Sequence, residues 1–130
     1  MITAIKKQLD KAKLHRYYRM IEEFRTIDPD MPVQQIATFL FVATREGSSV
    51  KAISAGTGQV SSSTSRNIAA LSKYHRLNKP GLDLIEARED PADRRYKTVH
   101  LTPKGHMFAE NLIYKIETTE EKEKGESKEL

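Results

Sequence analysis

Two short strands joined by a tight turn restrict the fold of this sequence more than any other feature. Residues 82–88 are typical of a strand, residues 89–94 are rich in Asp and Pro, and residues 96–101 alternate between the two faces of a returning strand. Thr102 can then cap a helix whose first position is Pro103, where proline is favoured. The pattern predicts a β-hairpin that leads directly into a helix.

Four helices are predicted before the hairpin, because apolar residues recur there at steps of three and four. The first, residues 2–27, carries two apolar strips, and the second strip would pack either within the domain or against a second copy of the chain. Asp28-Pro29 ends this helix, because proline disfavours helical geometry in its predecessor. The others are expected at residues 33–43, at a short segment capped by Ser48 or Ser49, and at residues 60–71.

The fourth predicted helix is unusual because it opens with serines. Serine is a mediocre residue inside a helix, since its hydroxyl competes for backbone hydrogen bonds. Short hydroxyls at a helix N-terminus suit phosphate oxygens and base edges, although they are equally typical of a polar capping cluster. Helical spacing predicts Thr64, Ile68 and Leu71 on the buried face, and Ser61, Ser62, Ser65 and Arg66 toward solvent, with Asn67 at the edge.

The order of the elements predicts the fold class. Two helices joined by a tight glycine-containing turn, with a β-hairpin directly after the second, form a helix-turn-helix with a wing. In such a fold the serine-rich helix can occupy the major groove of DNA. The hairpin tip, which carries Arg94 and Arg95, can then reach the DNA backbone or the adjacent minor groove.

The distribution of charge suggests a polyanionic partner. The net charge is +4, but residues 117–130 contain six glutamates and three lysines. Residues 1–116 therefore carry +7, from nineteen Lys and Arg against twelve Asp and Glu. A basic body indicates nucleic acid as the partner. Taken alone, however, the charge is explained equally well by a solvated surface that keeps the protein soluble.

The sequence resembles the MarR family of bacterial and archaeal transcriptional regulators from Met31 to Gly105. The more specific match is similar to the family's DPxDRR wing tip, return strand and LTxKG helix start. It consists of Asp90-Pro91-Ala92-Asp93-Arg94-Arg95 followed by Val99-His100-Leu101-Thr102-Pro103-Lys104-Gly105. A second match, similar to the family's recognition helix, consists of Ser63-Thr64-Ser65-Arg66 with Ile68 and Leu71.

The resemblance implies a homodimeric repressor that reads a pseudo-palindrome in double-stranded DNA, with its recognition helix at residues 61–75 and its wing at residues 84–101. Arg95 would enter the minor groove, and Asp93 would orient the wing through a salt bridge to Arg66. The predicted DNA-binding residues are Ser61, Ser62, Ser63, Ser65, Arg66, Arg94, Arg95 and Lys97. Further candidates for phosphate contacts are Lys51, Lys73 and Arg76.

The sequence departs from the family pattern in three places. About eight extra residues between Leu71 and Leu84 would either lengthen the recognition helix or form a loop at residues 78–82. Val60 stands where the family has a capping serine, so Ser61 or Thr57 would have to cap the helix. After Gly105 there is room for one helix where the family usually has two.

We therefore predict a mainly α fold with a small β-hairpin, a winged helix-turn-helix with N- and C-terminal dimerisation helices. Residues 1–116 would form the single domain, in which residues 31–102 are the DNA-binding lobe. The dimerisation helices would be residues 1–30 and 103–118. The charged tail, residues 117–130, is expected to be disordered, because its composition cannot sustain a core.

Members of the family often respond to a small-molecule effector, frequently an aromatic one, that binds between the dimerisation helices and the lobe. His15, Tyr17, Tyr18 and Phe24 could line such a site here. Aromatic residues at helical spacing are more typical of core packing, however, so no specific ligand is predicted.

The sequence argues against an enzyme and against a bound cofactor. The serines and His75 lack a strand-to-helix elbow and a third orienting group, and Gly56-Thr57-Gly58 lacks the ending of a phosphate loop. With no cysteine and no helically paired histidines, no metal site is expected. No apolar run could form a signal peptide or membrane span, so we expect a soluble, cytoplasmic protein. The alternative function is a winged-helix protein-interaction module without DNA binding.

Overall fold

The computed structural model describes residues 7–73 and 79–129, with the backbone alone for residues 118–129. The described residues form five helices and a three-stranded antiparallel sheet, so the predicted fold class, a mainly helical winged helix-turn-helix, is confirmed. The elements are α1 (Lys11–Ile27), α2 (Val33–Thr44), β1 (Ser48–Ser49), α3 (Val50–Thr57), α4 (Ser61–Leu71), β2 (Ile85–Glu89), β3 (Lys97–Leu101) and α5 (Pro103–Glu129).

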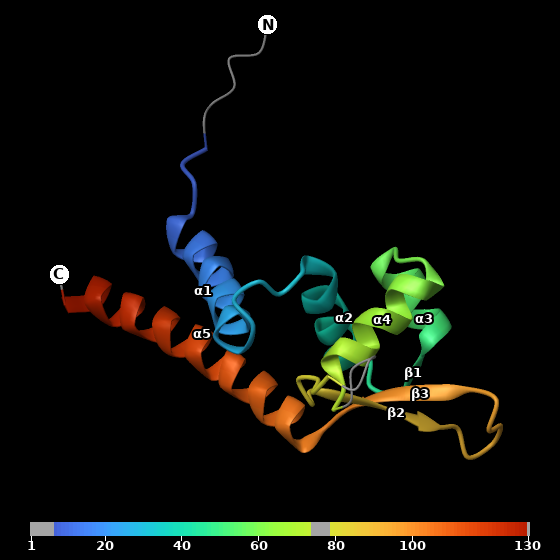
Figure 1. Cartoon of the computed structure of the whole chain (residues 1–130). Coiled ribbons are helices and arrows are strands. Elements are labelled where there is room, and N and C mark those ends of the chain that lie inside the picture. The colour runs from blue at the N-terminus through green and yellow to red at the C-terminus, as the bar shows by residue number, and fades with distance from the viewer. Residues whose placement is uncertain (1–6, 74–78, 130) are drawn as a thin grey trace, which may run out of the picture.

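The helices fall into two groups in space. α1 and α5 contact each other at one end of the molecule, while α2, α3 and α4 lie together beside the sheet (Figure 1). The hairpin of β2 and β3 projects from the lobe away from α1 and α5 (Figure 1). None of the helices in the described residues is long and apolar enough to cross a membrane.

α1 is shorter than predicted. It begins at Lys11 rather than at residue 2, because Asp10 caps it: the Asp10 carboxylate accepts a hydrogen bond from the Lys13 amide at 3.0 Å. Aspartate is among the best N-cap residues, and a side chain bonded in this way marks the first turn of a helix. Residues 1–6, which the prediction included, lie outside the described residues.

α5 is longer than predicted. The sequence suggested a disordered tail from residue 117, but the helix continues to Glu129. Glutamate and lysine, which dominate this segment, have high helix propensity, and no proline interrupts it. A helix that extends an already formed one needs no new nucleus, so composition alone did not reveal this extension.

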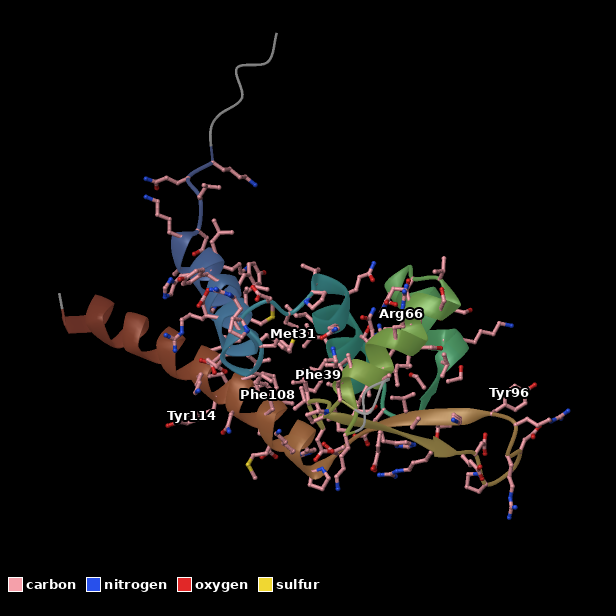
Figure 2. All side chains as sticks on the ribbon, viewed as in Figure 1. Met31, Phe39, Arg66, Tyr96, Phe108 and Tyr114 are labelled. Atoms are coloured by element: carbon pink, nitrogen blue, oxygen red, sulfur yellow. The ribbon has the colours of Figure 1, made fainter. Side chains whose placement is uncertain are left out.

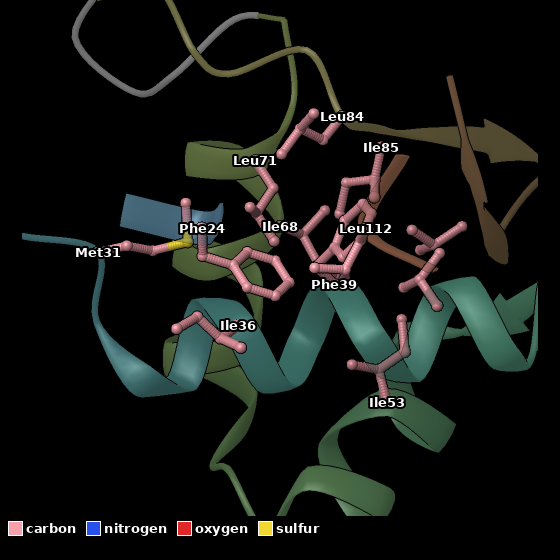
Figure 3. Packing of buried hydrophobic residues seen from close by; sticks show 12 residues of the cluster. Phe24, Met31, Ile36, Phe39, Ile53, Ile68, Leu71, Leu84, Ile85 and Leu112 are labelled. Carbon is pink, nitrogen blue, oxygen red and sulfur yellow. The ribbon is translucent and has the colours of Figure 1, made fainter. Parts of the chain in front are cut away.

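Three phenylalanines connect the two groups of helices. Phe24 of α1, Phe39 of α2 and Phe108 of α5 meet edge to face, with ring centroids 5.2 to 5.7 Å apart. Phe24 and Phe39 are fully buried. Around them the core continues toward the sheet and α4 through Ile36, Ile53, Ile68, Leu71, Leu84, Ile85, Val99 and Leu112 (Figure 3).

The sheet has one strand more than the predicted hairpin. Its order is β1-β3-β2, with Ile85 opposite Leu101 and Glu89 opposite Lys97 in the hairpin. β1 consists of two residues, so no alternation in the sequence could have revealed it. Its pairing, Ser48 with Val99 and Ser49 with Thr98, fixes the start of α3 beside the wing.

The predicted recognition helix does not continue into the residues after Leu71. α4 ends at Leu71, so the predicted extent to residue 75 is wrong, and residues 74–78 lie outside the described residues. The chain returns to the end of α4 at once: the Gly81 amide donates to the Lys73 carbonyl at 2.9 Å, and the Leu84 amide to the Leu71 carbonyl at 2.8 Å. The insertion therefore leaves from and returns to the same point.

The start of α5 confirms the predicted Thr-Pro signal. The Thr102 hydroxyl accepts a hydrogen bond from the Gly105 amide at 2.9 Å and donates one to the Asp83 carbonyl at 2.6 Å. This places Gly105 against the backbone of the chain entering β2, where a Cβ atom would lie 1.8 Å from the Leu84 carbonyl oxygen.

We expect Gly105→Ala to destabilise the protein. An alanine in a helix is ordinarily favoured over glycine by about 1 kcal/mol, but here the backbone clash should outweigh that gain and give a net loss of about 1 to 3 kcal/mol. Thermal unfolding followed by circular dichroism measures the change in Tm. Lys104→Ala, at the exposed neighbour, is the matched control and should leave Tm nearly unchanged. A Tm of Gly105→Ala equal to or above that of the wild type would contradict the close approach.

Candidate nucleic-acid interface

The exposed face of α4 carries the predicted polar residues. Thr64, Ile68 and Leu71 are buried against the lobe, while Ser61, Ser62, Ser65 and Arg66 are exposed. Ser63 is half-buried, and its hydroxyl accepts a hydrogen bond from the Arg66 guanidinium at 3.3 Å. The outer face of α4 thus carries exposed serine hydroxyls. It also carries the guanidinium of Arg66, which is labelled in Figure 2.

The turn before α4 is the one that a helix-turn-helix requires. Gly58 ends α3 with a φ of 67°, in the left-handed region that glycine adopts without strain, and the Gln59 amide donates to the Ser54 carbonyl at 3.0 Å. Ser49, and not Ser48, caps α3, since its hydroxyl accepts from the Ala52 amide at 3.0 Å. α4 has Val60 at its N-cap position with no side-chain cap, so the expected caps Ser61 and Thr57 are both wrong.

A buried polar network centred on Gln59 fixes the orientation of α4. The Gln59 amide nitrogen donates to the hydroxyls of Thr38 at 2.9 Å and Thr57 at 2.7 Å, and its oxygen accepts from the Asn67 side-chain amide at 2.5 Å. Thr38 is fully buried on α2 and Gln59 is 8% exposed. Hydrogen bonds are directional, so this network sets how α4 is rotated against α2 and α3.

Sequence reasoning missed this network. Asn67 was placed at the edge of the solvent-facing side, but its amide turns inward to Gln59. A second bond, from the Ser54 hydroxyl to the Thr64 hydroxyl at 2.7 Å, joins α3 to α4. The available signal was Thr38, a polar residue inside the apolar helix α2 that needs a partner when buried.

The wing tip is an internally bonded loop. The Asp90 amide donates to the Tyr96 carbonyl at 2.9 Å and the Tyr96 amide to the Asp93 carbonyl at 3.0 Å. Asp93 accepts from the Arg95 backbone amide and Nε, both at 3.1 Å, and from Arg95 Nη2 at 2.9 Å. These bonds close the turn without help from the rest of the lobe.

Asp93 is therefore paired with Arg95, and the predicted salt bridge from Asp93 to Arg66 is wrong. Asp93 and Arg95 are two positions apart, so a tight turn brings them together locally, whereas Arg66 would have to reach across from another element. Arg66 bonds within its own helix instead. The wing-orienting role expected of Asp93 becomes a local one, because the carboxylate holds the arginine of its own loop.

The pairing changes the acid-base behaviour of both groups. Hydrogen bonds from the Arg95 side chain, and then from its backbone amide, hold the pKa of Asp93 below its ordinary value. The bond to Asp93 raises the pKa of Arg95. The Arg95 side chain is 84% accessible and that of Asp93 is 31% accessible, so the pair is ionised at neutral pH and the guanidinium remains available to a ligand.

The other predicted site residues that the structure describes are also on the surface of the lobe, while Arg76 lies outside the described residues. Arg94 is exposed at the wing tip, and Lys97 is exposed at the start of β3, opposite Glu89. Arg95 and Lys97 line a surface groove whose far wall is formed by Ser49, Val50 and Lys51 of the α3 start. The wing tip therefore borders α3, and α3 in turn contacts α4.

The residues suggested for an effector site are divided between core and surface. Phe24 is fully buried in the phenylalanine cluster, so it does not line a ligand site. Tyr17 and Tyr18 are more than half exposed on α1, where the His15 ring lies 5.8 Å from that of Tyr18. Of these four residues, Phe24 is therefore part of the core, while Tyr17 and Tyr18 are on the surface of α1.

Comparison with known proteins identifies the fold. No protein-family model and no curated protein sequence matches the chain. Among solved structures it is similar to MepR of S. aureus in complex with DNA, at 17% identity and a TM-score of 0.62 over 89% of this chain and 90% of MepR. It is similar to the transcriptional repressor CouR bound to a 23-mer DNA duplex, at 19% identity and a TM-score of 0.59 over 87% and 72% of the two chains. It is also similar to MarR, at 20% identity and a TM-score of 0.57 over 82% of this chain and 69% of MarR. The chain has the winged-helix fold of these regulators.

We expect Gln59→Ala to lower stability by about 1 to 3 kcal/mol, because it removes the buried amide that hydrogen-bonds to Thr38, Thr57 and Asn67. Urea unfolding should show a lower midpoint at unchanged slope. Gln8→Ala, at an exposed position before α1, is the control and should unfold as the wild type does. An unchanged midpoint for Gln59→Ala would show that the network does not hold α4.

The pKa of the Asp93 carboxyl should lie below that of an ordinary aspartate and should rise in Arg95→Ala. Since the folded-state pKa is lowered, the stabilisation of the wing is present above the ordinary pKa and is lost as the pH falls through the lowered one. Carboxyl carbon NMR titration measures both values. Arg94→Ala is the matched control and should leave the Asp93 titration unchanged; the same shift in both variants would contradict a specific pair.

Proposed function

We propose that the protein is a sequence-specific, double-stranded DNA-binding transcriptional regulator that acts as a dimeric repressor. The observation that supports this most is the combination, on one basic lobe, of a helix with a hydroxyl-rich outer face and a wing with Arg94 and Arg95 at its tip. MepR and CouR, which share the fold, are structurally characterised on DNA.

The proposed binding mode assigns a groove to each element. α4 would enter the major groove, where the hydroxyls of Ser61, Ser62 and Ser65 donate to or accept from base edges and phosphates. Arg66 would contact a base or a phosphate from the same face. The wing would follow the adjacent minor groove with Arg95, whose guanidinium uses only part of its five donors on Asp93.

Dimerisation would use the outer faces of α1 and α5. The two helices are joined by an ion pair between Lys115 and Glu23 at 2.8 Å, and each exposes large apolar side chains. A second copy would bury this surface, and each Å² of apolar surface removed from water contributes about 25 cal/mol to the free energy of association. The exposed side chains are Leu14, Tyr17, Tyr18 and Ile21 on α1, and Met107, Ile113 and Tyr114 on α5.

Selection of bound duplexes from a random pool tests the function directly. The expected result is a pseudo-palindrome whose half-sites are separated by about ten base pairs, one helical turn, because a twofold dimer places its two recognition helices in successive major grooves. Enrichment of a single half-site would contradict the dimer. No enrichment, together with no salt-dependent affinity for random duplex, would favour the protein-interaction module instead.

On the selected duplex we expect Arg95→Ala to bind severalfold more weakly than the wild type with unchanged Tm, because the side chain is exposed and bonded only within its own loop. Arg66→Ala should also bind more weakly, and should relax the sequence preference if it contacts a base. Fluorescence polarisation at moderate salt measures both affinities. Lys11→Ala, which removes a charge from the exposed start of α1, is the control. Wild-type affinity of Arg95→Ala would refute the wing assignment.

A further inference from the structure

A cationic groove separates the wing from the start of α3. It is lined by Ser49, Val50 and Lys51 on one side and by Arg95, Tyr96 and Lys97 on the other. Lys51 and Lys97 are exposed, as is Arg95, so three positive side chains border one hollow. No acidic residue is among those that line it.

The register of the sheet explains why this groove exists. Ser49 pairs with Thr98, so α3 starts at the point where β3 continues outward into the wing. Tyr96 and Lys97 extend past the end of β1 and face the first turn of α3 across the gap. In Figure 2, Tyr96 lies on the side of the wing where α3 is, and its side chain is 60% exposed.

The geometry of DNA predicts what lies in this gap. A sugar-phosphate strand always separates a major groove from the minor groove beside it, so a protein that reads both must straddle one strand. α3 contacts both α4 and β3, which puts the groove between the two elements proposed to enter DNA. Phosphate oxygens carry the negative charge, and lysine, arginine and tyrosine hydroxyl groups are their usual partners.

We propose that this groove is a backbone-phosphate site, in which Lys51 and the Tyr96 hydroxyl hold the strand between the major and minor grooves. This rests on the proposed function and extends it. Arg95 has a different task, because Asp93 orients its guanidinium along the wing tip. Lys51 and Tyr96 make no base contact in this arrangement, so they position the protein on DNA and leave its sequence preference unaffected.

The inference can be tested with the full-length protein and the selected duplex. Lys51→Ala removes one phosphate contact, so the plot of log affinity against log salt should become shallower by about one unit, with the selected sequence unchanged. Tyr96→Phe removes a hydrogen bond but no charge, so affinity should fall while the salt slope stays as in the wild type. Lys11→Ala should change neither quantity, and circular dichroism confirms that each variant is folded.

A duplex with single methylphosphonate substitutions locates the contact. In the wild type, neutralising one phosphate between the two grooves should weaken binding, and Lys51→Ala should be insensitive to that one substitution. Wild-type affinity and slope in both Lys51→Ala and Tyr96→Phe, on a duplex that the wild type binds, would overturn this inference while the proposed function stands. Failure of the wild type to bind any duplex would refute the proposed function and this inference together.

Discussion

The contact among Phe24, Phe39 and Phe108 holds the molecule together, because each ring comes from a different helix and two of those helices, α1 and α5, lie outside the lobe formed by α2, α3, α4 and the sheet. Edge-to-face pairs of this kind contribute about 0.5 to 1.5 kcal/mol each beyond the area they bury. Close-packed rings cannot slide past one another gradually. A change in the angle between α1 and α5 must therefore move α2, and with it the lobe, or else break the cluster.

A second joint, with different physics, lies between α2 and α4. The buried side chains of Ile68 and Leu71 stabilise the contact between these helices. Apolar packing is not directional, so it does little to fix how α4 is rotated about its own axis. The bonds from Gln59 to Thr38 and Asn67 supply that preference, because each has a required direction. The phenylalanine cluster thus fixes where the lobe lies relative to α1 and α5. The Gln59 hydrogen bonds determine which side of α4 faces outward.

Periodicity predicted the helices and the hairpin because those signals repeat over several residues. It could not predict where α1 begins or α5 ends, since a single capping side chain, Asp10, decides the first and the extension of an already formed helix decides the second. β1 has two residues and leaves no period. The resemblance supplied Asp93 as an important residue but the wrong partner, because the choice between Arg66 and Arg95 depends on the local course of the loop. Gln59 was missed since its role depends on how α2 and α4 pack, which brings Thr38 and Asn67 to the same side chain.

The lack of a side-chain cap on α4 is explained by the packing of its buried face. Losing an N-cap typically costs about 1 kcal/mol, and a run of serines adds to that cost. α4 tolerates both because its buried face, through Thr64, Ile68 and Leu71, is held by the lobe. The side chains of Ser61, Ser62 and Ser65 are then not needed to keep the helix folded. The exposed face of α4, which we propose contacts DNA, can therefore change its side chains without a change in the structure that presents it.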